Sequence, residues 1–119
     1  MKLPIAFTEP SQHREFSAGS TIFKTGDPGD EMFVVQEGEV DIVIDGTVVE
    51  TVGPDGFFGE LALIDRATRA ADAVVRTDCK LIAMNQHRFL FMVDEMPFFA
   101  IRVMTVMADR LRRATRNTA

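Results

Sequence analysis

Short hydrophobic runs fill the chain between residues 21 and 85, and turn-forming residues interrupt them about every eight to twelve positions. In the run 40–45 hydrophobic and polar side chains largely alternate, as expected for a strand with one buried face. Asp45-Gly46 follows, a residue pair that favours a type I′ hairpin turn, so residues 47–52 are expected to pair back. The pattern therefore predicts a β region.

Across the whole chain we expect about eight short strands. Val, Ile and Phe dominate the candidate segments, and glycine, proline and aspartate separate them. The candidate strands are residues 14–17, 21–24, 32–37, 40–45, 47–52, 72–77 and 79–84.

The C-terminal part of the sequence predicts two helices. The first covers residues 85–95 with Asn85 as its N-cap, and the second runs from Pro97 to about Arg116. The second helix carries two hydrophobic lines: Ala100, Ile101, Met104, Met107, Ala108 and Leu111 form one, and Phe99, Val103 and Val106 the other. Either one line packs on the strands while the other meets a ligand or partner, or both lines belong to the core.

Strands followed by helices predict a mainly β protein, an antiparallel β-roll or jelly-roll-like barrel with flanking α-helices. We expect one domain over residues 1–119, with an N-terminal segment (1–20), the β-roll (21–85) and the C-terminal helices (86–116).

Charge is unevenly distributed along the 119 residues. The net charge of −5 argues against a nucleic-acid-binding domain. From residue 102 onward, however, five arginines face one aspartate, which makes the last 18 residues about +4 and leaves about −9 for the rest. These cations suit the C-terminal end of a helix dipole; contact with DNA or acidic lipid is the alternative.

Composition also limits where the protein is expected in the cell and which catalytic or metal chemistry it could carry. No hydrophobic run approaches membrane-spanning length, no secretion leader is evident, and the lone Cys79 indicates a reducing compartment, so we expect a cytoplasmic protein. The two histidines, His13 and His87, lie far apart in the sequence, and neither they nor Cys79 adjoin the groups that catalysis or a metal site requires. We therefore expect no enzyme, no metal and no cofactor.

The segment "GELALI" (59–64) differs from its β surroundings because it consists mostly of good helix formers. We predict one or two helical turns, whose first N–H groups lack partners within the helix and favour an anion. Arg69 lies just beyond, and its guanidinium suits two phosphate oxygens. Glu60 suits a sugar hydroxyl instead. The alternative is a plain surface ion pair between Glu60 and Arg69.

Two sequence motifs resemble the signatures of the cyclic nucleotide-binding domain family. "FGELAL" (58–63) followed by "RAADAVV" (69–75) is similar to its phosphate-binding cassette, and "GDPGDEMFVVQEG" (26–38) to its upstream signature. "SAGSTIF" (17–23) and "MADRLRR" (107–113) extend the resemblance to the bacterial catabolite activator class.

The resemblance implies a role for each matched position. Glu60 would accept a hydrogen bond from the ribose 2′-OH, and Arg69 would pair with the exocyclic phosphate oxygens. The remaining ligand contacts are expected from the backbone and small side chains of Gly59, Leu61, Ala62, Ala70 and Ala71. Gly26, Gly29 and Gly38 match turn glycines, whose implied role is fold geometry.

The sequence departs from the family pattern at three places. Thr68 stands where proline is common, and Ala70 stands where domains that prefer cGMP often have threonine, which favours cAMP over cGMP. No Trp or Tyr is available to cover the base. The candidates for this base cap are Met104, Arg110, Leu111 and Thr115.

The implied function is a cAMP (or, second, cGMP) sensor that rearranges its C-terminal helices and signals to an effector protein or through self-association. No DNA-binding module or transmembrane segment is expected in these 119 residues. The alternatives are an interaction module with an unused pocket, and a regulatory domain cut from a larger channel or regulator.

Overall fold

The computed structural model describes residues 13–118. Within these residues the chain divides into two compact units, with the boundary between residues 86 and 87.

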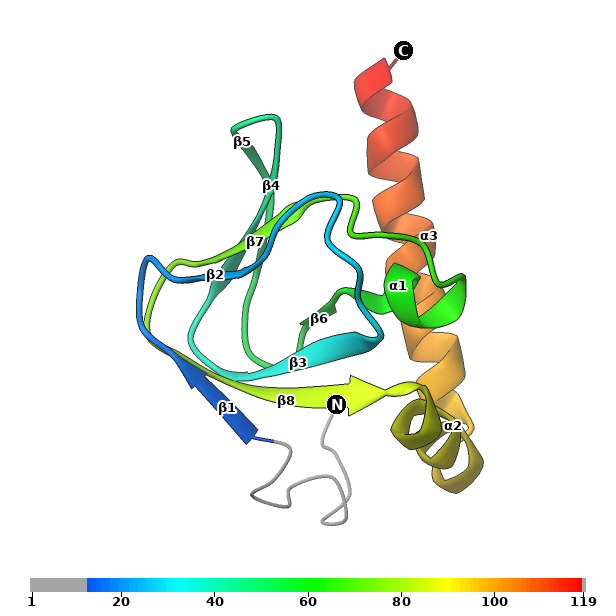
Figure 1. Cartoon of the computed structure of the whole chain (residues 1–119). Helices are drawn as coiled ribbons and strands as arrows, with labels where there is room; N and C mark the ends of the chain where they lie inside the picture. The colour runs from blue at the N-terminus through cyan, green and yellow to red at the C-terminus, as the bar shows by residue number, and fades with distance from the viewer. Residues whose placement is uncertain (1–12, 119) are drawn as a thin grey trace. The chain divides into compact units, whose positions relative to one another are not determined.

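The first unit contains two antiparallel sheets of four strands each (Figure 1). One sheet has the order β1 (His13–Phe16), β8 (Cys79–Asn85), β3 (Glu31–Glu37) and β6 (Phe57–Phe58). The other has the order β2 (Thr21–Phe23), β7 (Asp72–Val75), β4 (Val40–Ile44) and β5 (Thr47–Val52). The expected antiparallel β-roll is confirmed, but its two sheets stay separate and do not close into one barrel.

The strand β6 is absent from the sequence-based expectation. It has two residues, Phe57 and Phe58, which pair with Val34 and Phe33 of β3. A strand this short shows no alternation, and the turn residues directly before it disguise it further. These two residues form a strand only because they pair with β3, and this contact between distant segments is not visible in the sequence.

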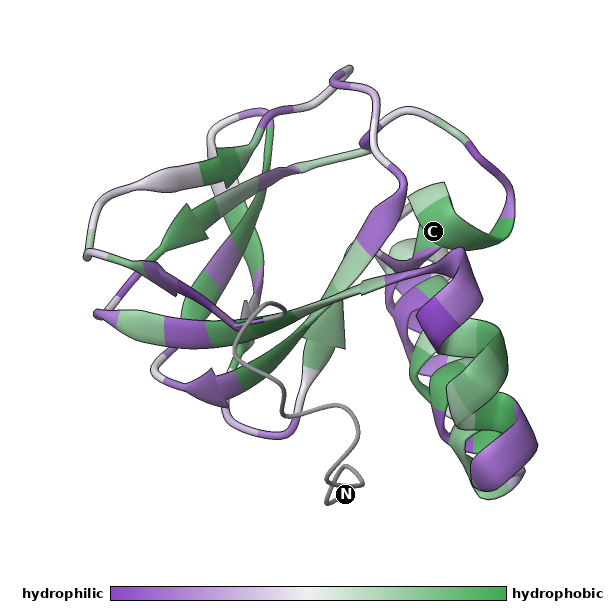
Figure 2. Ribbon diagram, turned by 60° about the horizontal axis from the view of Figure 1, so that its bottom comes forward, coloured by the Kyte–Doolittle hydropathy of each residue, from purple (hydrophilic) through white to green (hydrophobic). Residues whose placement is uncertain are grey.

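The core lies between the two sheets. Buried residues from both sheets form one cluster, among them Phe33, Val40, Phe58 and Leu81. Figure 2 shows hydrophobic and hydrophilic residues mixed along the strands, as expected where one face of a strand is buried. The expected β4–β5 hairpin is also present, and Asp45 and Gly46 both have positive φ, 50° and 78°, as a type I′ turn requires.

The short helix predicted at 59–64 is present as α1 (Glu60–Ile64). Gly59 precedes it with φ 80°, in the left-handed region where glycine carries no steric penalty. Ala62 and Leu63 are buried, whereas Leu61 and Ile64 are exposed. The helix therefore sits between β6 and β7 as a single turn with one buried side.

The second unit consists of the helices α2 (Gln86–Glu95) and α3 (Phe98–Thr118). The first residue of α2, Gln86, still belongs to the first unit. Asn85 directly precedes α2, as expected for a cap, and Pro97 directly precedes α3. The rings of Phe89 and Phe99 meet edge to face at 5.5 Å between centroids. None of the helices in the described part of the chain is long and hydrophobic enough to cross a membrane.

The two hydrophobic lines of α3 differ in exposure. Phe99 and Val103 are buried, with at most 2% of their surface exposed. Ile101, Met104 and Leu111, from the other line, each expose more than half of theirs (56%, 54% and 68%). Ala100, Met107 and Ala108 of that same line are half-buried. Contact of this line with a ligand or a partner stays a prediction.

Candidate functional site

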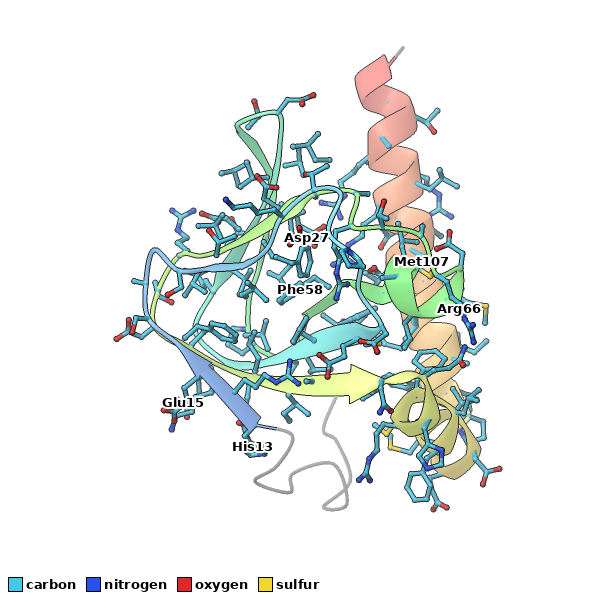
Figure 3. All side chains as sticks on the ribbon, viewed as in Figure 1. His13, Glu15, Asp27, Phe58, Arg66 and Met107 are labelled. Carbon is cyan, nitrogen blue, oxygen red and sulfur yellow. The ribbon has the colours of Figure 1, made fainter. Side chains whose placement is uncertain are left out.

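The two sequence motifs meet at the backbone of Arg69. The Gly26 N–H donates a hydrogen bond to the Arg69 carbonyl oxygen at 2.8 Å, and the Arg69 N–H donates to the Asp27 carbonyl oxygen at 2.9 Å. Asp27 belongs to the loop that follows β2 (Figure 3). The loop of the upstream motif thus fixes the backbone from which the arginine side chain extends.

The Arg69 side chain is buried, with 7% of its surface exposed. Its Nη1 donates to the Gly59 carbonyl oxygen at 3.0 Å, and its Nη2 donates to the Glu31 carbonyl oxygen at 2.9 Å. Its Nε is buried and has no hydrogen-bond partner among residues 13–118. A buried donor of a charged group without a partner is energetically costly, which singles out this N–H among the buried polar groups of the site.

Aromatic rings support the same guanidinium. The guanidinium carbon of Arg69 lies 4.1 Å from the centroid of Phe23 and 5.9 Å from that of Phe33. Phe23 in turn packs on Phe58, with 5.9 Å between centroids, and Phe58 lies in the interior enclosed by the strands (Figure 3). Cation–π attraction and this packing hold the arginine in one place.

Burial and the neighbouring carboxylates shift the pKa of Arg69 in opposite directions. Loss of hydration lowers the pKa of its guanidinium, and the carboxylates of Glu31, Asp30, Asp27 and Glu60 raise it. An arginine starts so far above neutral pH that it stays charged. The site therefore presents a buried positive charge that four acids surround without any of them capping the Nε.

Two glycines leave the space that this side chain occupies. A Cβ on Gly29 would collide with the Nε, Cζ and Nη2 atoms of Arg69. A Cβ on Gly59 would lie 2.8 Å from its Nη1. Gly26 and Gly38 have positive φ, as turn glycines should, but Gly29 does not, so its role is to make room for Arg69 rather than to form a turn.

The structure also brings Glu60, the second predicted ligand-binding side chain, close to Arg69. Glu60 is buried, with 5% of its surface exposed, and opens the first turn of α1 directly after Gly59. Gly59, the residue directly before Glu60, accepts the hydrogen bond from Nη1 of Arg69 through its main-chain oxygen. The expectation of a plain surface ion pair is therefore wrong, because both charged side chains are buried.

The remaining predicted contacts lie on both sides of this pair. Ala62 is buried in α1 while Leu61 exposes its side chain. Ala70 is exposed and Ala71 is half-buried in the segment that leads into β7. Their ligand contacts stay a prediction.

The four base-cap candidates lie on α3, in the second unit. Met104 and Leu111 are exposed, and the Thr115 hydroxyl donates to the Leu111 carbonyl oxygen at 3.0 Å. Arg110 is half-buried. Their role as a cap stays a prediction.

The other candidate groups for metal binding or nucleophilic chemistry are Cys79 and the His, Asp and Glu side chains. No group of three or more His, Cys, Asp or Glu in that part of the chain could hold a metal ion. Cys79 is buried in β8, and burial raises the pKa of its thiol, which makes it a poor nucleophile.

Sequence reasoning missed three participants in the site. Phe23 reads as an ordinary strand residue, and Glu31 contributes its main-chain oxygen, which any residue would supply. Gly29 was visible in the motif, but its contact with Arg69 depends on how two distant loops meet.

Together, the fold and the site define a class: a β-roll module with a buried arginine between two glycine-containing loops. The chain belongs to the cyclic nucleotide-binding domain family, because the family model for the cyclic nucleotide-binding domain matches residues 13–96.

Three of the similar proteins illustrate the range of the matches. The "CRP-like cAMP-activated global transcriptional regulator" of Mycobacterium tuberculosis is 30% identical over 119 residues, which is 96% of this chain and 53% of the relative. The catabolite activator protein of Thermus thermophilus has a TM-score of 0.80 at 30% identity, over 90% of this chain and 53% of its own. The regulatory domain of Toxoplasma gondii PKA with cAMP has a TM-score of 0.62 at 35% identity, over 68% of this chain and 33% of its own. This chain thus spans about half the length of the two bacterial regulators.

Proposed function

We propose that this chain is the ligand-sensing part of a regulator, that it binds a cyclic nucleotide without converting it, and that its preferred ligand is cAMP. Membership in the cyclic nucleotide-binding domain family supports the ligand class. The similarity to a cAMP-activated regulator and to a domain solved with cAMP supports the particular nucleotide.

The observation that carries the proposal is the unpartnered Nε of Arg69 in a buried site. A cyclic phosphate has one negative charge and exposes two exocyclic oxygens, which suits a guanidinium that still has an N–H to donate. Gly29 and Gly59 keep side chains away from the same group. Accordingly, Arg69 takes the phosphate, and the backbone around Gly59 and Ala70 completes the cradle.

Glu60 takes the sugar. A carboxylate is an acceptor only, so it repels the phosphate but accepts a hydrogen bond from the ribose 2′-OH. Its burial in the first turn of α1, directly after the glycine whose carbonyl oxygen binds Arg69, supports this role because it puts the carboxylate in the same site.

The signal is a shift in population between two arrangements of the chain. Ligand phosphate draws α1 and Arg69 together, and α2 and α3 then repack and change the surface offered to an effector or to a second copy. The base-cap candidates Met104, Arg110, Leu111 and Thr115 would take part in that step.

The main alternative ligand is cGMP. Ala70 lacks the hydroxyl that the resemblance assigns to cGMP-preferring domains, which favours cAMP. Replacing Ala70 by threonine should therefore raise the affinity for cGMP relative to cAMP, as measured by titrating both nucleotides against both proteins.

Calorimetric titration with cAMP and cGMP tests the proposal. The protein is first unfolded, dialysed and refolded to remove any copurified nucleotide. We expect micromolar or tighter binding of cAMP, lost in Arg69→Ala and weakened in Arg69→Lys. Arg76→Ala is the matched control, because Arg76 is an exposed arginine on the same unit that pairs with Asp41 at 3.5 Å.

No heat and no change in melting temperature with either nucleotide would contradict the proposal. The chain would then be an interaction module of the same fold with an unused pocket. Equal losses in Arg69→Ala and Arg76→Ala would assign the effect to overall charge.

A further inference from the structure

An ion pair outside the binding site leads directly to Arg69. The Arg14 side chain of β1 donates two parallel hydrogen bonds to the Glu31 carboxylate, Nη1 to Oε1 at 2.8 Å and Nη2 to Oε2 at 2.9 Å. The main-chain oxygen of the same Glu31 accepts the hydrogen bond from Nη2 of Arg69 at 2.9 Å. Glu31 is thus held through its side chain by one arginine and holds the other through its backbone.

We propose that Arg14 is a positioning residue for the anion site: its bidentate pair with Glu31 fixes the carbonyl that orients Arg69. The inference rests on the proposed function for its effect on nucleotide affinity, although the effect on Arg69 itself does not depend on any ligand.

Geometry explains why this pair acts on the site rather than on stability alone. Glu31 is the first residue of β3, where the strand meets the loop that carries Gly29. A strand end has fewer ladder hydrogen bonds than its middle, so a side-chain anchor there has more effect on the backbone. Arg14 lies on β1, which is separated from β3 by β8, so the pair spans the width of three strands.

The charge of the Glu31 carboxylate gives a second reason why loss of Arg14 would weaken phosphate binding. Of the four acids that influence Arg69, Glu31 has the largest electrostatic effect. Arg14 neutralises this carboxylate, so its removal would leave an unpaired negative charge beside a site for an anionic phosphate. Loss of Arg14 therefore weakens phosphate binding both by loosening Arg69 and by repulsion.

The pair itself contributes little to folding. Its side chains are 43% and 26% exposed, and ion pairs that water reaches typically stabilise a fold only slightly. A change in melting temperature of the ligand-free protein should consequently be small. This separates a positioning role from a merely structural one.

The test compares Arg14→Gln with Lys80→Gln in the full chain. Lys80 is the matched control because it is a similarly exposed cation (48%) of the same sheet, and it pairs at 3.8–3.9 Å with Glu15 and Glu37 rather than with Glu31. We expect Arg14→Gln to weaken cAMP binding about threefold to fivefold, and Lys80→Gln to leave it unchanged. Arg14→Lys keeps the charge but loses the fork, so it should recover only part of the loss.

A second measurement needs no nucleotide. Hydrogen exchange of the Arg69 Nε–H is followed by NMR in the ligand-free protein, with Arg69→Lys used to assign the signal. Exchange should be slow in the wild type, because Nε is buried, and faster in Arg14→Gln but not in Lys80→Gln. Reversing the pair, Arg14→Glu with Glu31→Arg, should restore slow exchange, whereas each single reversal should accelerate it.

Each outcome decides between the explanations. Unchanged exchange and affinity in Arg14→Gln would overturn the inference. Equal effects of Arg14→Gln and Lys80→Gln would mean that the loss of any positive charge from this sheet weakens binding. If the double reversal does not restore slow exchange, the Arg14–Glu31 pair does not position Arg69. If the wild type binds no cyclic nucleotide, the proposed function fails, and the exchange measurement still decides the role of Arg14.

Discussion

Arg69 and Phe23 form the closest cation–aromatic pair of the site, with 4.1 Å between the guanidinium carbon and the ring centroid. The two residues come from segments 46 positions apart, and the ring belongs to the aromatic group of Phe23, Phe33 and Phe58. A hydrophobic core therefore extends up to the charged group on which ligand binding is proposed to depend. Packing against these rings restricts the arginine side chain, which lowers the entropic cost of binding.

Replacing Phe23 by leucine keeps a hydrophobic side chain but removes the aromatic face. Cation–π attraction is worth about 0.5–2 kcal/mol, so cAMP affinity should fall by roughly twofold to thirtyfold. Calorimetric titration measures the loss. Phe98→Leu on α3, where the ring is 82% exposed, is the control and should bind like the wild type. Equal affinity in both variants would show that the Phe23 ring contributes only packing.

Replacing Gly29 by alanine should disturb the site without changing a charge. The new Cβ would occupy the space of the Arg69 guanidinium, so either the arginine or the loop must move. We expect cAMP affinity to fall by an order of magnitude or more, and overpacking to lower the free energy of unfolding by about 1–3 kcal/mol. Denaturant unfolding and titration give the two values.

Gly53→Ala is the control for that substitution. A Cβ on Gly53 meets nothing within 4 Å, and its φ is not in the left-handed region. This variant should match the wild type in both measurements. A Gly29→Ala protein that binds normally would refute the steric role assigned to Gly29.

The proposed role of Glu60 predicts a pattern over two ligands. If its carboxylate accepts the ribose 2′-OH, the wild type should bind cAMP more tightly than 2′-deoxy-cAMP by roughly tenfold to a hundredfold, as expected for a hydrogen bond to a charged group. Glu60→Ala should bind both ligands with similar affinity. The loss for cAMP should also be smaller than in Arg69→Ala, because a hydroxyl rather than a charge loses its partner. Undiminished discrimination in Glu60→Ala would assign the hydroxyl to another group.

Asp72 links β7 to the loop after β2 and predicts a dependence on pH. The Thr25 N–H donates to its carboxylate at 2.7 Å and the Thr25 hydroxyl at 3.0 Å, and these hydrogen bonds, the backbone one first, hold the pKa of Asp72 below its ordinary 3.8. A lowered folded-state pKa stabilises the fold above the ordinary pKa, and this contribution disappears as pH falls through the folded value.

The melting temperature of Asp72→Asn should therefore be lower than that of the wild type near neutral pH. The difference should shrink as the pH falls below about 3.8. Thr25→Val keeps the N–H donor and should show a smaller difference with the same pH profile. A difference that stays constant with pH would mean that the carboxylate charge is not involved.

Local chemistry within the sequence determined most of the elements. The alternation in residues 40–45 and the Asp45-Gly46 pair specify a hairpin, since side-chain direction and positive φ are properties of neighbouring residues. The helix-forming run after Gly59 specifies α1 for the same reason. The sequence also pointed to Glu60 and Arg69 as site residues. Charged residues are uncommon in a stretch of small hydrophobic residues, and the motifs around them are specific.

Only the tertiary structure decided how these elements meet. The two separate sheets, the strand β6 and the pairing of the 26–27 loop with Arg69 join residues far apart in the chain. The carbonyl oxygens of Gly59 and Glu31 that hold Arg69 belong to the main chain, which is the same in every residue and leaves no trace in the sequence. The room beside Gly29 and the link from Arg14 likewise exist only once the fold has brought distant residues within hydrogen-bond or contact distance.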